Sequence, residues 1–136
     1  MNFIKDEEFI RGNCPMTKEE IRILVIAKMG LKNTDKVLDI GAGTGSISIQ
    51  ASKLAKNVVA IEKDSEALEV IYKNKDKFKA HNLSVIEGEA LEVALSIKEE
   101  FDVVFVGGSD GNIKQILRTY TNKIKQSGSS IYTHHY

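Results

Sequence analysis

Short apolar runs alternate with helical patterns along most of this chain, and that alternation restricts the fold more than any other feature. The apolar runs are rich in β-branched residues and cover 36–40, 58–62, 83–87, 101–106 and, less clearly, 129–133. The helical patterns cover 18–29, 44–55, 65–79, 91–97 and 113–125. Strands without regular polar alternation, separated by helices, predict an α/β fold with a doubly wound, mostly parallel sheet covered on both faces.

Length and composition predict a single domain over residues 1–136, with 1–16 as an N-terminal extension and 17–134 as the core. The 19 Lys and Arg residues balance 19 Asp and Glu residues, so the zero net charge does not favour nucleic-acid binding. The lone Cys14 allows no internal disulfide, and the charged start is unlike a signal peptide, which together predict a cytoplasmic protein. The apolar runs are far shorter than the ~20 residues that cross a bilayer, so we expect no membrane insertion.

The first helical pattern carries local start and stop signals. Thr17 followed by Glu20 has the spacing of a capping box, in which each side chain satisfies an amide at the start of a helix. Gly30 supplies a C-terminal stop. The pattern predicts a helix that begins at Lys18 and ends at Met29.

A glycine-rich string follows the first apolar run and opens the second helical pattern. It reads Asp39-Ile40-Gly41-Ala42-Gly43-Thr44-Gly45, in which the glycines allow a ligand close to the backbone and the helix start offers free amides. The third glycine comes one residue earlier than in a dinucleotide fingerprint. Asp39 suits an ammonium group better than a pyrophosphate, and S-adenosylmethionine carries such a group. A tight strand-to-helix turn without a ligand is the alternative.

Acidic residues end the next two predicted strands. Glu62 lies about twenty residues beyond the loop, where a carboxylate accepts hydrogen bonds from ribose hydroxyls. Glu89 is placed to accept a hydrogen bond from an adenine amino group. The backbone near Ala90 is placed to contact the edge of the adenine ring. Each acid alone is as well explained as a solvated surface group. Because the carboxyl ends of parallel strands share one crevice, together they predict a nucleoside-type cofactor site.

The fourth predicted strand runs into a loop that begins Gly107-Gly108-Ser109, followed by Asp110. We expect Gly107, Gly108 and Ser109 on the substrate side of the site, although a plain flexible loop is nearly as good an interpretation. We expect no metal site, since His134 and His135 have no acid partner at ligand spacing and His81 lies at a helix end, where a surface position is expected. Cys14 has no neighbour that marks a reactive thiolate, so a structural or incidental role is favoured.

The glycine loop and Glu62 resemble motif I and the second-strand acid of class I S-adenosylmethionine-dependent methyltransferases, which have a Rossmann-like fold. Three further stretches extend the likeness, namely Asp6 to Gly12, the string Pro15-Met16-Thr17-Lys18-Glu19-Glu20-Ile21-Arg22, and Val106 to Ser109. With them, the chain from about residue 3 to residue 128 is similar to the family of decarboxylating cobalt-precorrin-6B C15-methyltransferases.

That resemblance implies methylation of C15 of cobalt-precorrin-6B, a corrinoid, with loss of the C12 acetate carboxyl as carbon dioxide, to give cobalt-precorrin-7 in anaerobic cobalamin synthesis. By the same resemblance Thr17, the loop from Gly41 to Gly45, Glu62 and Ala90 line the cofactor, and the enzyme is a homo-oligomer, a tetramer. No residue is singled out as a general base or other catalytic group.

Two departures from the family pattern shape the remaining expectations. Asp110 stands where the family usually has glycine, and the ending at 129–136 lacks the apolar character of a strand leading onward. We therefore expect a core that lacks the last two strands of the family fold. The alternatives are a class I methyltransferase for another small molecule, an S-adenosylmethionine-binding protein without turnover, and a dehydrogenase.

Overall fold

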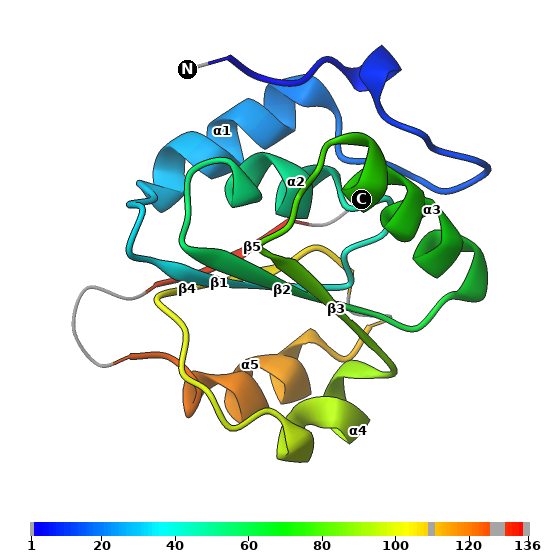
Figure 1. The fold of residues 1–136 in the computed structure, drawn as a ribbon. Helices are drawn as coiled ribbons and strands as arrows, with labels where there is room; N and C mark the ends of the chain where they lie inside the picture. Colours follow the sequence, from blue (N-terminus) through cyan, green and yellow to red (C-terminus); the bar gives the residue numbers. More distant parts are fainter. Residues whose placement is uncertain (1, 109–110, 126–129, 135–136) are drawn as a thin grey trace.

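The computed structural model describes residues 2–108, 111–125 and 130–134, and these form one twisted sheet between two layers of helices (Figure 1). The strands are β1 (Lys36–Ile40), β2 (Asn57–Glu62), β3 (Leu83–Glu87), β4 (Val103–Val106) and β5 (Ser130–Thr133). They lie in the order β3-β2-β1-β4-β5, and every pair is parallel. The predicted doubly wound parallel sheet is confirmed. The strand order reverses between β1 and β4, which is where sheets of this type bind ligands.

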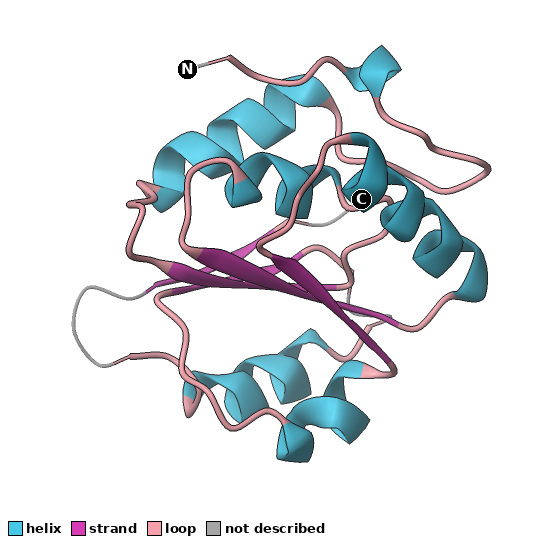
Figure 2. Cartoon of the chain, viewed as in Figure 1, coloured by secondary structure: helices cyan, strands magenta, loops and turns pink. Residues whose placement is uncertain are grey.

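Helices cover both faces of the sheet (Figures 1 and 2). One layer holds the N-terminal segment, by which we mean residues 2–16, with α1 (Glu19–Met29), α2 (Ser46–Ser52) and α3 (Ser65–Lys77). That segment includes the 3-10 helix η1 (Asp6–Glu8). The opposite layer holds α4 (Ala90–Val93), the 3-10 helix η2 (Ala94–Ser96) and α5 (Ile113–Thr121). In the part of the chain that the model describes, no helix is long and apolar enough to cross a membrane.

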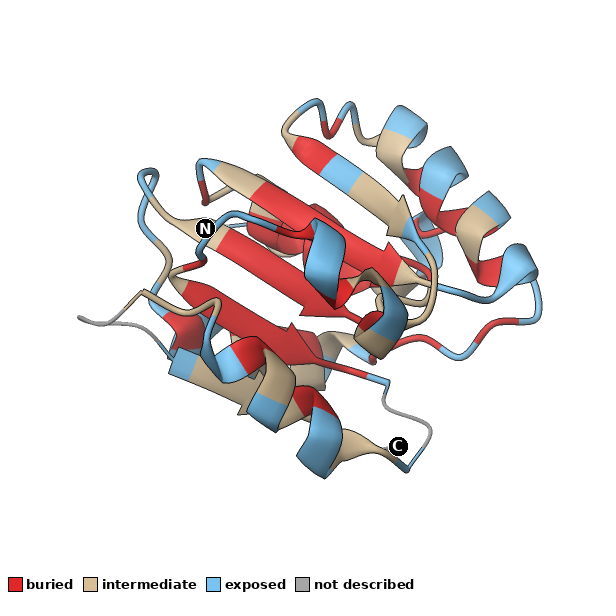
Figure 3. Ribbon diagram, turned by 90° about the horizontal axis from the view of Figure 1, so that it is seen from below, coloured by how far each residue is buried: buried red, intermediate tan, exposed pale blue. Residues whose placement is uncertain are grey.

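Each central strand sends alternate side chains into two separate hydrophobic cores. The central strands are buried along most of their length (Figure 3). Val37 and Phe105 face the core under α1, α2 and α3, whereas Leu38 and Val104 face the core over α5. All four side chains are buried. Burial on both faces explains why the strands read as continuous apolar runs in the sequence.

Backbone conformation and tertiary contacts shorten several predicted elements. The predicted helix 44–55 begins only at Ser46, because Gly45 takes a left-handed φ of 84°. The predicted helix 65–79 ends at Lys77, since Lys79 has a φ of 52°. The predicted helix 91–97 is split into α4 and η2. The predicted helix 113–125 ends at Thr121, and the predicted strand 101–106 begins at Val103, because Phe101 and Ile124 form an isolated parallel bridge.

The predicted capping box at Thr17 is wrong. Helix α1 begins at Glu19, its N-cap is Lys18, and no side chain of that N-cap residue bonds to the helix. The Glu19 amide instead donates to Asp6 Oδ2 over 3.1 Å, so a carboxylate from the N-terminal segment satisfies the helix start. The predicted stop at Gly30 is confirmed, because this residue ends the helix with a φ of 55°.

Candidate functional site

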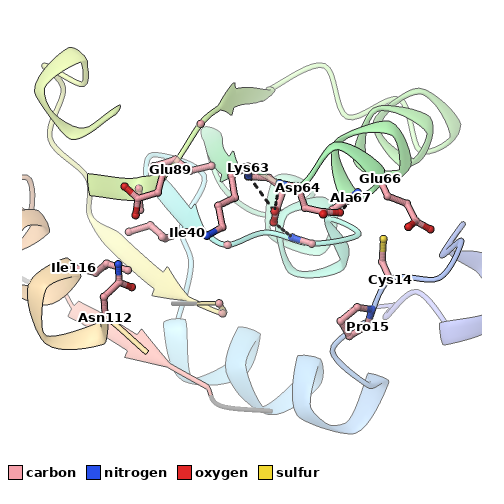
Figure 4. A pocket seen from close by; sticks show the side chains of 18 of the residues that line it. Cys14, Pro15, Ile40, Lys63, Asp64, Glu66, Ala67, Glu89, Asn112 and Ile116 are labelled. Carbon is pink, nitrogen blue, oxygen red and sulfur yellow. Dashed lines mark hydrogen bonds between the residues drawn. The ribbon is translucent and has the colours of Figure 1, made fainter. Parts of the chain in front are cut away.

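A cavity of about 520 Å³ opens at the carboxyl ends of β1, β2, β3 and β4 (Figure 4). Its volume falls within the roughly 300–1,000 Å³ of small-molecule sites. Seven predicted site residues line it, namely Gly41, Gly43, Glu62, Glu89, Ala90, Gly107 and Gly108. The lining also includes residues that sequence reasoning did not select, among them Asn13, Cys14, Pro15, Lys63, Asp64, Glu66, Ala67, Asn112 and Ile116.

The glycine loop after β1 needs its glycines for backbone conformation and for close packing. Gly41 has a φ of 71°, and a Cβ built there would lie 2.4 Å from the carbonyl oxygen of Gly108. Gly43 also has a left-handed φ, of 59°. The loop after β1 and the loop after β4 therefore touch through backbone atoms, and together they form one wall of the cavity.

Four amides of this loop already donate within the protein, so they are not among the free amides that the sequence predicts at the start of the helix. The amides of Gly41 and Ala42 donate to Ile61 O over 2.9 and 3.1 Å. The Gly45 amide donates to Ala42 O over 2.9 Å. The Gly43 amide donates to Glu62 Oε1 over 2.8 Å. The loop is thus held in shape by β2, and these four amides are not available to a phosphate or carboxylate.

Glu62 lies at the cavity edge and organises the turn after β2. Its Oε2 accepts from the amides of Lys63 and Asp64, each over 3.0 Å, while Oε1 accepts from Gly43. A carboxylate has about four acceptor positions, so roughly one remains. A side chain fixed by three bonds offers that last position to a ligand in a defined direction.

The far end of the cavity combines apolar walls with polar groups. Figure 4 shows Glu89 and Asn112 at the end where Ile40 and Ile116 lie. Glu89 Oε2 caps α4 by accepting from the amides of Leu91 and Glu92. Asn112 Oδ1 is buried and has no hydrogen-bond partner. Apolar walls with a carboxylate and an amide at their margin suit a heteroaromatic ring. We call this part of the cavity, between Ile40 and Ile116, the slot.

Asp39 lies beneath the glycine loop and is not part of the cavity lining. Its Oδ2 accepts from Ser48 Oγ over 2.6 Å, because strand alternation points it toward α2. The pKa of Asp39 is raised from 3.8 to about 7, mainly by burial; the hydrogen bonds from Ser48 oppose this shift, and nearby Glu62 adds to it. The other predicted residues outside the lining are Thr17, Ala42, Thr44 and Gly45, and Ser109 falls outside the described residues.

The N-terminal segment supplies a wall of the cavity through Asn13, Cys14 and Pro15. The Asn13 amide donates to Glu66 Oε1 over 3.0 Å, which ties this wall to α3. The sequence showed these residues only as an extension before the core, since nothing in their local pattern indicates a partner 53 residues away.

The Cys14 thiol belongs to this wall, so its position is not incidental. Burial raises its pKa, and the carboxylates of Glu66, Asp64 and Glu62 raise it further. These effects oppose thiolate formation, as expected for a residue that is not a nucleophile.

Carboxylates dominate the charge of the cavity. Glu62, Asp64, Glu66 and Glu89 line it, against one lysine, Lys63. Figure 4 shows Asp64 and Glu66 on the side next to Cys14 and Glu89 at the opposite end. Such a lining attracts a cation and disfavours a polyanion.

The fold and this cavity together define a class I methyltransferase, with a parallel sheet in 3-2-1-4-5 order and a glycine loop after β1. The precorrin methyltransferase domain matches residues 8–133, and the chain belongs to that family.

Named relatives and solved structures agree with this assignment. The chain is 43% identical over 129 residues to the probable cobalt-precorrin-6B C(15)-methyltransferase (decarboxylating) of Sulfolobus acidocaldarius, covering 92% of this chain and 67% of that protein. It is 36% identical over 133 residues to the cobalt-precorrin-6B C(15)-methyltransferase (decarboxylating) of Salmonella typhimurium, covering 96% and 68%. A crystal structure of precorrin-6y C5,15-methyltransferase from Geobacter metallireducens superposes with a TM-score of 0.88 at 32% identity, covering 96% and 69%. The chain spans about two thirds of the length of these relatives.

Proposed function

We propose that the chain binds S-adenosylmethionine in this cavity and methylates a cobalt-precorrin. The observation that carries the proposal is the carboxylate-lined cavity beside the glycine loop in a chain of the precorrin methyltransferase family. S-adenosylmethionine carries a cationic sulfonium and a cationic ammonium group against one carboxylate, and its adenine ring is flat. The charge and the shape of the cavity both suit such a molecule.

The nucleoside half of the ligand fits the part of the cavity between Glu62 and Glu89. The remaining acceptor position of Glu62 binds a ribose hydroxyl in this proposal, and the adenine ring packs in the slot beside Ile40 and Ile116. Glu89 and the backbone at Ala90 lie at the margin of that slot, where the edge of the ring would be read. These assignments extend the sequence-based hypothesis to side chains that surround the slot.

The methionine half is assigned to the glycine loop and the segment before α1. Gly41 and Gly43 let the ligand approach the backbone. The proposed site also includes residues of the same loop and of the segment before α1, namely Thr17, Ala42, Thr44 and Gly45. Asp39 lies beneath the loop and accepts from Ser48, and an ammonium group bound nearby would favour the charged form of its carboxyl group.

A pyrophosphate-containing dinucleotide fits the cavity less well. Four carboxylates repel its charge, and the amides of Gly41, Ala42, Gly43 and Gly45 are already used within the protein. The lining thus supports the methyltransferase over the dehydrogenase alternative.

The proposed reaction methylates C15 of cobalt-precorrin-6B and releases the C12 acetate carboxyl as carbon dioxide, as the names of the relatives indicate for those proteins. S-adenosylmethionine supplies an activated methyl group, C15 of the ring supplies the electron pair of the new bond, and the sulfur keeps the pair of the broken bond. The electron pair left by carbon dioxide stays on the former acetate methylene, which takes up a proton from water and becomes a methyl group. The chain itself contributes orientation in this proposal, because Gly107 and Gly108 line the cavity without side chains that would keep a large flat ring away. Orientation effects reach ~7 to 11 kcal/mol, so no general base is assigned. A homo-oligomer is part of the proposal, and analytical ultracentrifugation tests it.

Calorimetry followed by an activity assay tests the proposal. Titration with S-adenosylmethionine and with S-adenosylhomocysteine is expected to show one site per chain, and a nicotinamide dinucleotide is expected not to bind. Incubation with cobalt-precorrin-6B is then expected to yield a product that has gained a methyl group and lost carbon dioxide, read by mass spectrometry. Failure to bind either sulfur ligand refutes the cofactor, whereas binding without product refutes the reaction alone.

A further inference from the structure

The buried amide of Asn74, on α3, joins two chain segments that both form the candidate site. Its side chain is 0% exposed. Its Nδ2 donates to Ile10 O and to Thr44 O, each over 2.8 Å, and its Oδ1 accepts from the Ile10 amide over 2.9 Å. Both of its donor hydrogens and its acceptor are therefore used, which fixes the orientation of the amide.

The two segments held by Asn74 both contribute residues to the lining of the cavity. Thr44 belongs to the glycine loop, and Ile10 belongs to the N-terminal segment a few residues before Asn13, Cys14 and Pro15, which line the cavity. The two segments also approach each other directly, because a Cβ built at Gly43 would lie 3.7 Å from Pro15 O. Asn74 thus bonds to both of the segments that meet there.

We propose that Asn74 is a positioning residue that couples the N-terminal segment to the glycine loop, so that both walls are in place before the ligand arrives. The inference rests on the proposed function, since it concerns the binding of S-adenosylmethionine and its product. Holding the two walls together raises the fraction of molecules in the binding-competent form, and the apparent affinity rises by that same factor. Asn74 acts through the two backbone segments and need not touch the ligand.

Other anchors of the N-terminal segment do not reach the glycine loop, which provides a matched control. Gln50 is also buried, and its Oε1 accepts from the Ile4 amide over 2.9 Å. It lies outside the cavity lining. Loss of either anchor destabilises the fold by removing a buried hydrogen bond, but only the loss of Asn74 also removes a bond to the glycine loop, at Thr44 O.

The test compares Asn74→Asp with Gln50→Met by calorimetry with S-adenosylhomocysteine. Asn74→Asp keeps the acceptor for the Ile10 amide but places an oxygen where Nδ2 faces two carbonyls. The expected result is a loss of affinity of about tenfold or more for Asn74→Asp, as the competent fraction falls, and affinity within about twofold of wild type for Gln50→Met. Unfolding in urea shows how far each variant is destabilised. Equal losses of affinity in the two variants, or none in Asn74→Asp, overturn the inference.

Alkylation of Cys14 gives a second readout, because it is the only cysteine of the chain and lies in the wall that Asn74 holds. Iodoacetamide is expected to label Asn74→Asp faster than wild type, with Gln50→Met labelled at the wild-type rate. Equal labelling of Asn74→Asp and wild type contradicts the coupling.

Hydrogen exchange in the wild-type protein keeps the inference testable even if Asn74→Asp does not fold. Bound S-adenosylhomocysteine is expected to slow exchange of the Ile10 amide, which bonds to Asn74, and to leave the Ile4 amide, which bonds to Gln50, unchanged. An unchanged Ile10 amide in protein that binds the ligand refutes the coupling alone. Absence of ligand binding by the wild type refutes the proposed function instead.

Discussion

Replacement of Gly41 by alanine tests whether the contact between the β1 and β4 loops builds the cavity. Gly41 has a φ of 71°, and its new Cβ would lie 2.4, 2.6 and 2.7 Å from O, N and Cα of Gly108. A left-handed conformation costs an alanine about 1–2 kcal/mol. The clash is with backbone, so the β4 loop must shift, at a further cost of about 1–3 kcal/mol. The free energy of unfolding is expected to fall by roughly 2–5 kcal/mol.

Gly30→Ala is the matched control, because it isolates the backbone conformation from the clash. Gly30 has a φ of 55°, and a Cβ built there has no atom within 4 Å. This variant should lose only the conformational cost, about 1–2 kcal/mol. Urea unfolding followed by circular dichroism measures both variants, and calorimetry with S-adenosylhomocysteine measures their affinities.

Affinity separates a local contact from a general loss of stability. Gly41→Ala is expected to bind S-adenosylhomocysteine more weakly, since the shifted loop carries Gly107 and Gly108 in the cavity wall. Gly30→Ala, at the end of α1, is expected to bind like wild type. If Gly41→Ala is destabilised no more than Gly30→Ala and binds equally well, the reasoning from the close contact is refuted.

Three further changes test the site. The pKa of Asp39 is raised from 3.8 to about 7, so the folded state holds a proton that the unfolded state releases, and stability from this group falls as pH rises from about 4 to 7. The stability of wild type relative to Asp39→Asn in urea should therefore drop by roughly 2–4 kcal/mol over that range, and a constant difference contradicts the burial argument. Tyr120→Phe removes the hydroxyl that donates to Ala90 O, and thermal unfolding should show a loss of about 1–3 kcal/mol; no loss would mean that water replaces the bond. Glu62→Gln should weaken S-adenosylmethionine binding by about 10- to 100-fold, as expected for the loss of a charged hydrogen bond. Glu87→Gln, a charge change outside the cavity lining, should bind like wild type, and equal effects would refute the role of Glu62.

Strand positions were predictable from sequence, and helix ends much less so. The bounds of β1 and β3 match the apolar runs 36–40 and 83–87, because burial on both faces leaves a continuous apolar signal. Helix ends depend on single-residue conformations such as the left-handed φ of Gly45 and Lys79. The local sequence pattern also does not show that Phe101 pairs with Ile124. This pairing takes Phe101 out of β4 and Ile124 out of α5.

The site residues that follow the carboxyl ends of the strands were predictable from the parallel topology of the sheet. Parallel strands bring their carboxyl ends to one edge, so residues after β1, β2, β3 and β4 were expected together, and Gly41, Glu62, Glu89 and Gly107 do line one cavity. The same reasoning predicted that Asp39 lies in the site, because it begins the glycine-rich string from Asp39 to Gly45. Strand alternation instead turns Asp39 toward Ser48, so its neighbours along the chain line the cavity while it supports them.

The N-terminal wall was not predictable, because its contacts join residues far apart in sequence. Ile4 bonds to Gln50, 46 residues away, and Ile10 bonds to Asn74, 64 residues away. Arg22 is fully buried beneath this segment, with its guanidinium 2.6 Å from Asp6 Oδ1 and over the ring of Phe9. A buried charge is tolerated only where it is paired, so Asp6 and the segment that carries it are required by the core itself. The segment is therefore an integral part of the fold, and the same contacts that satisfy the core bring Asn13, Cys14 and Pro15 to the cavity.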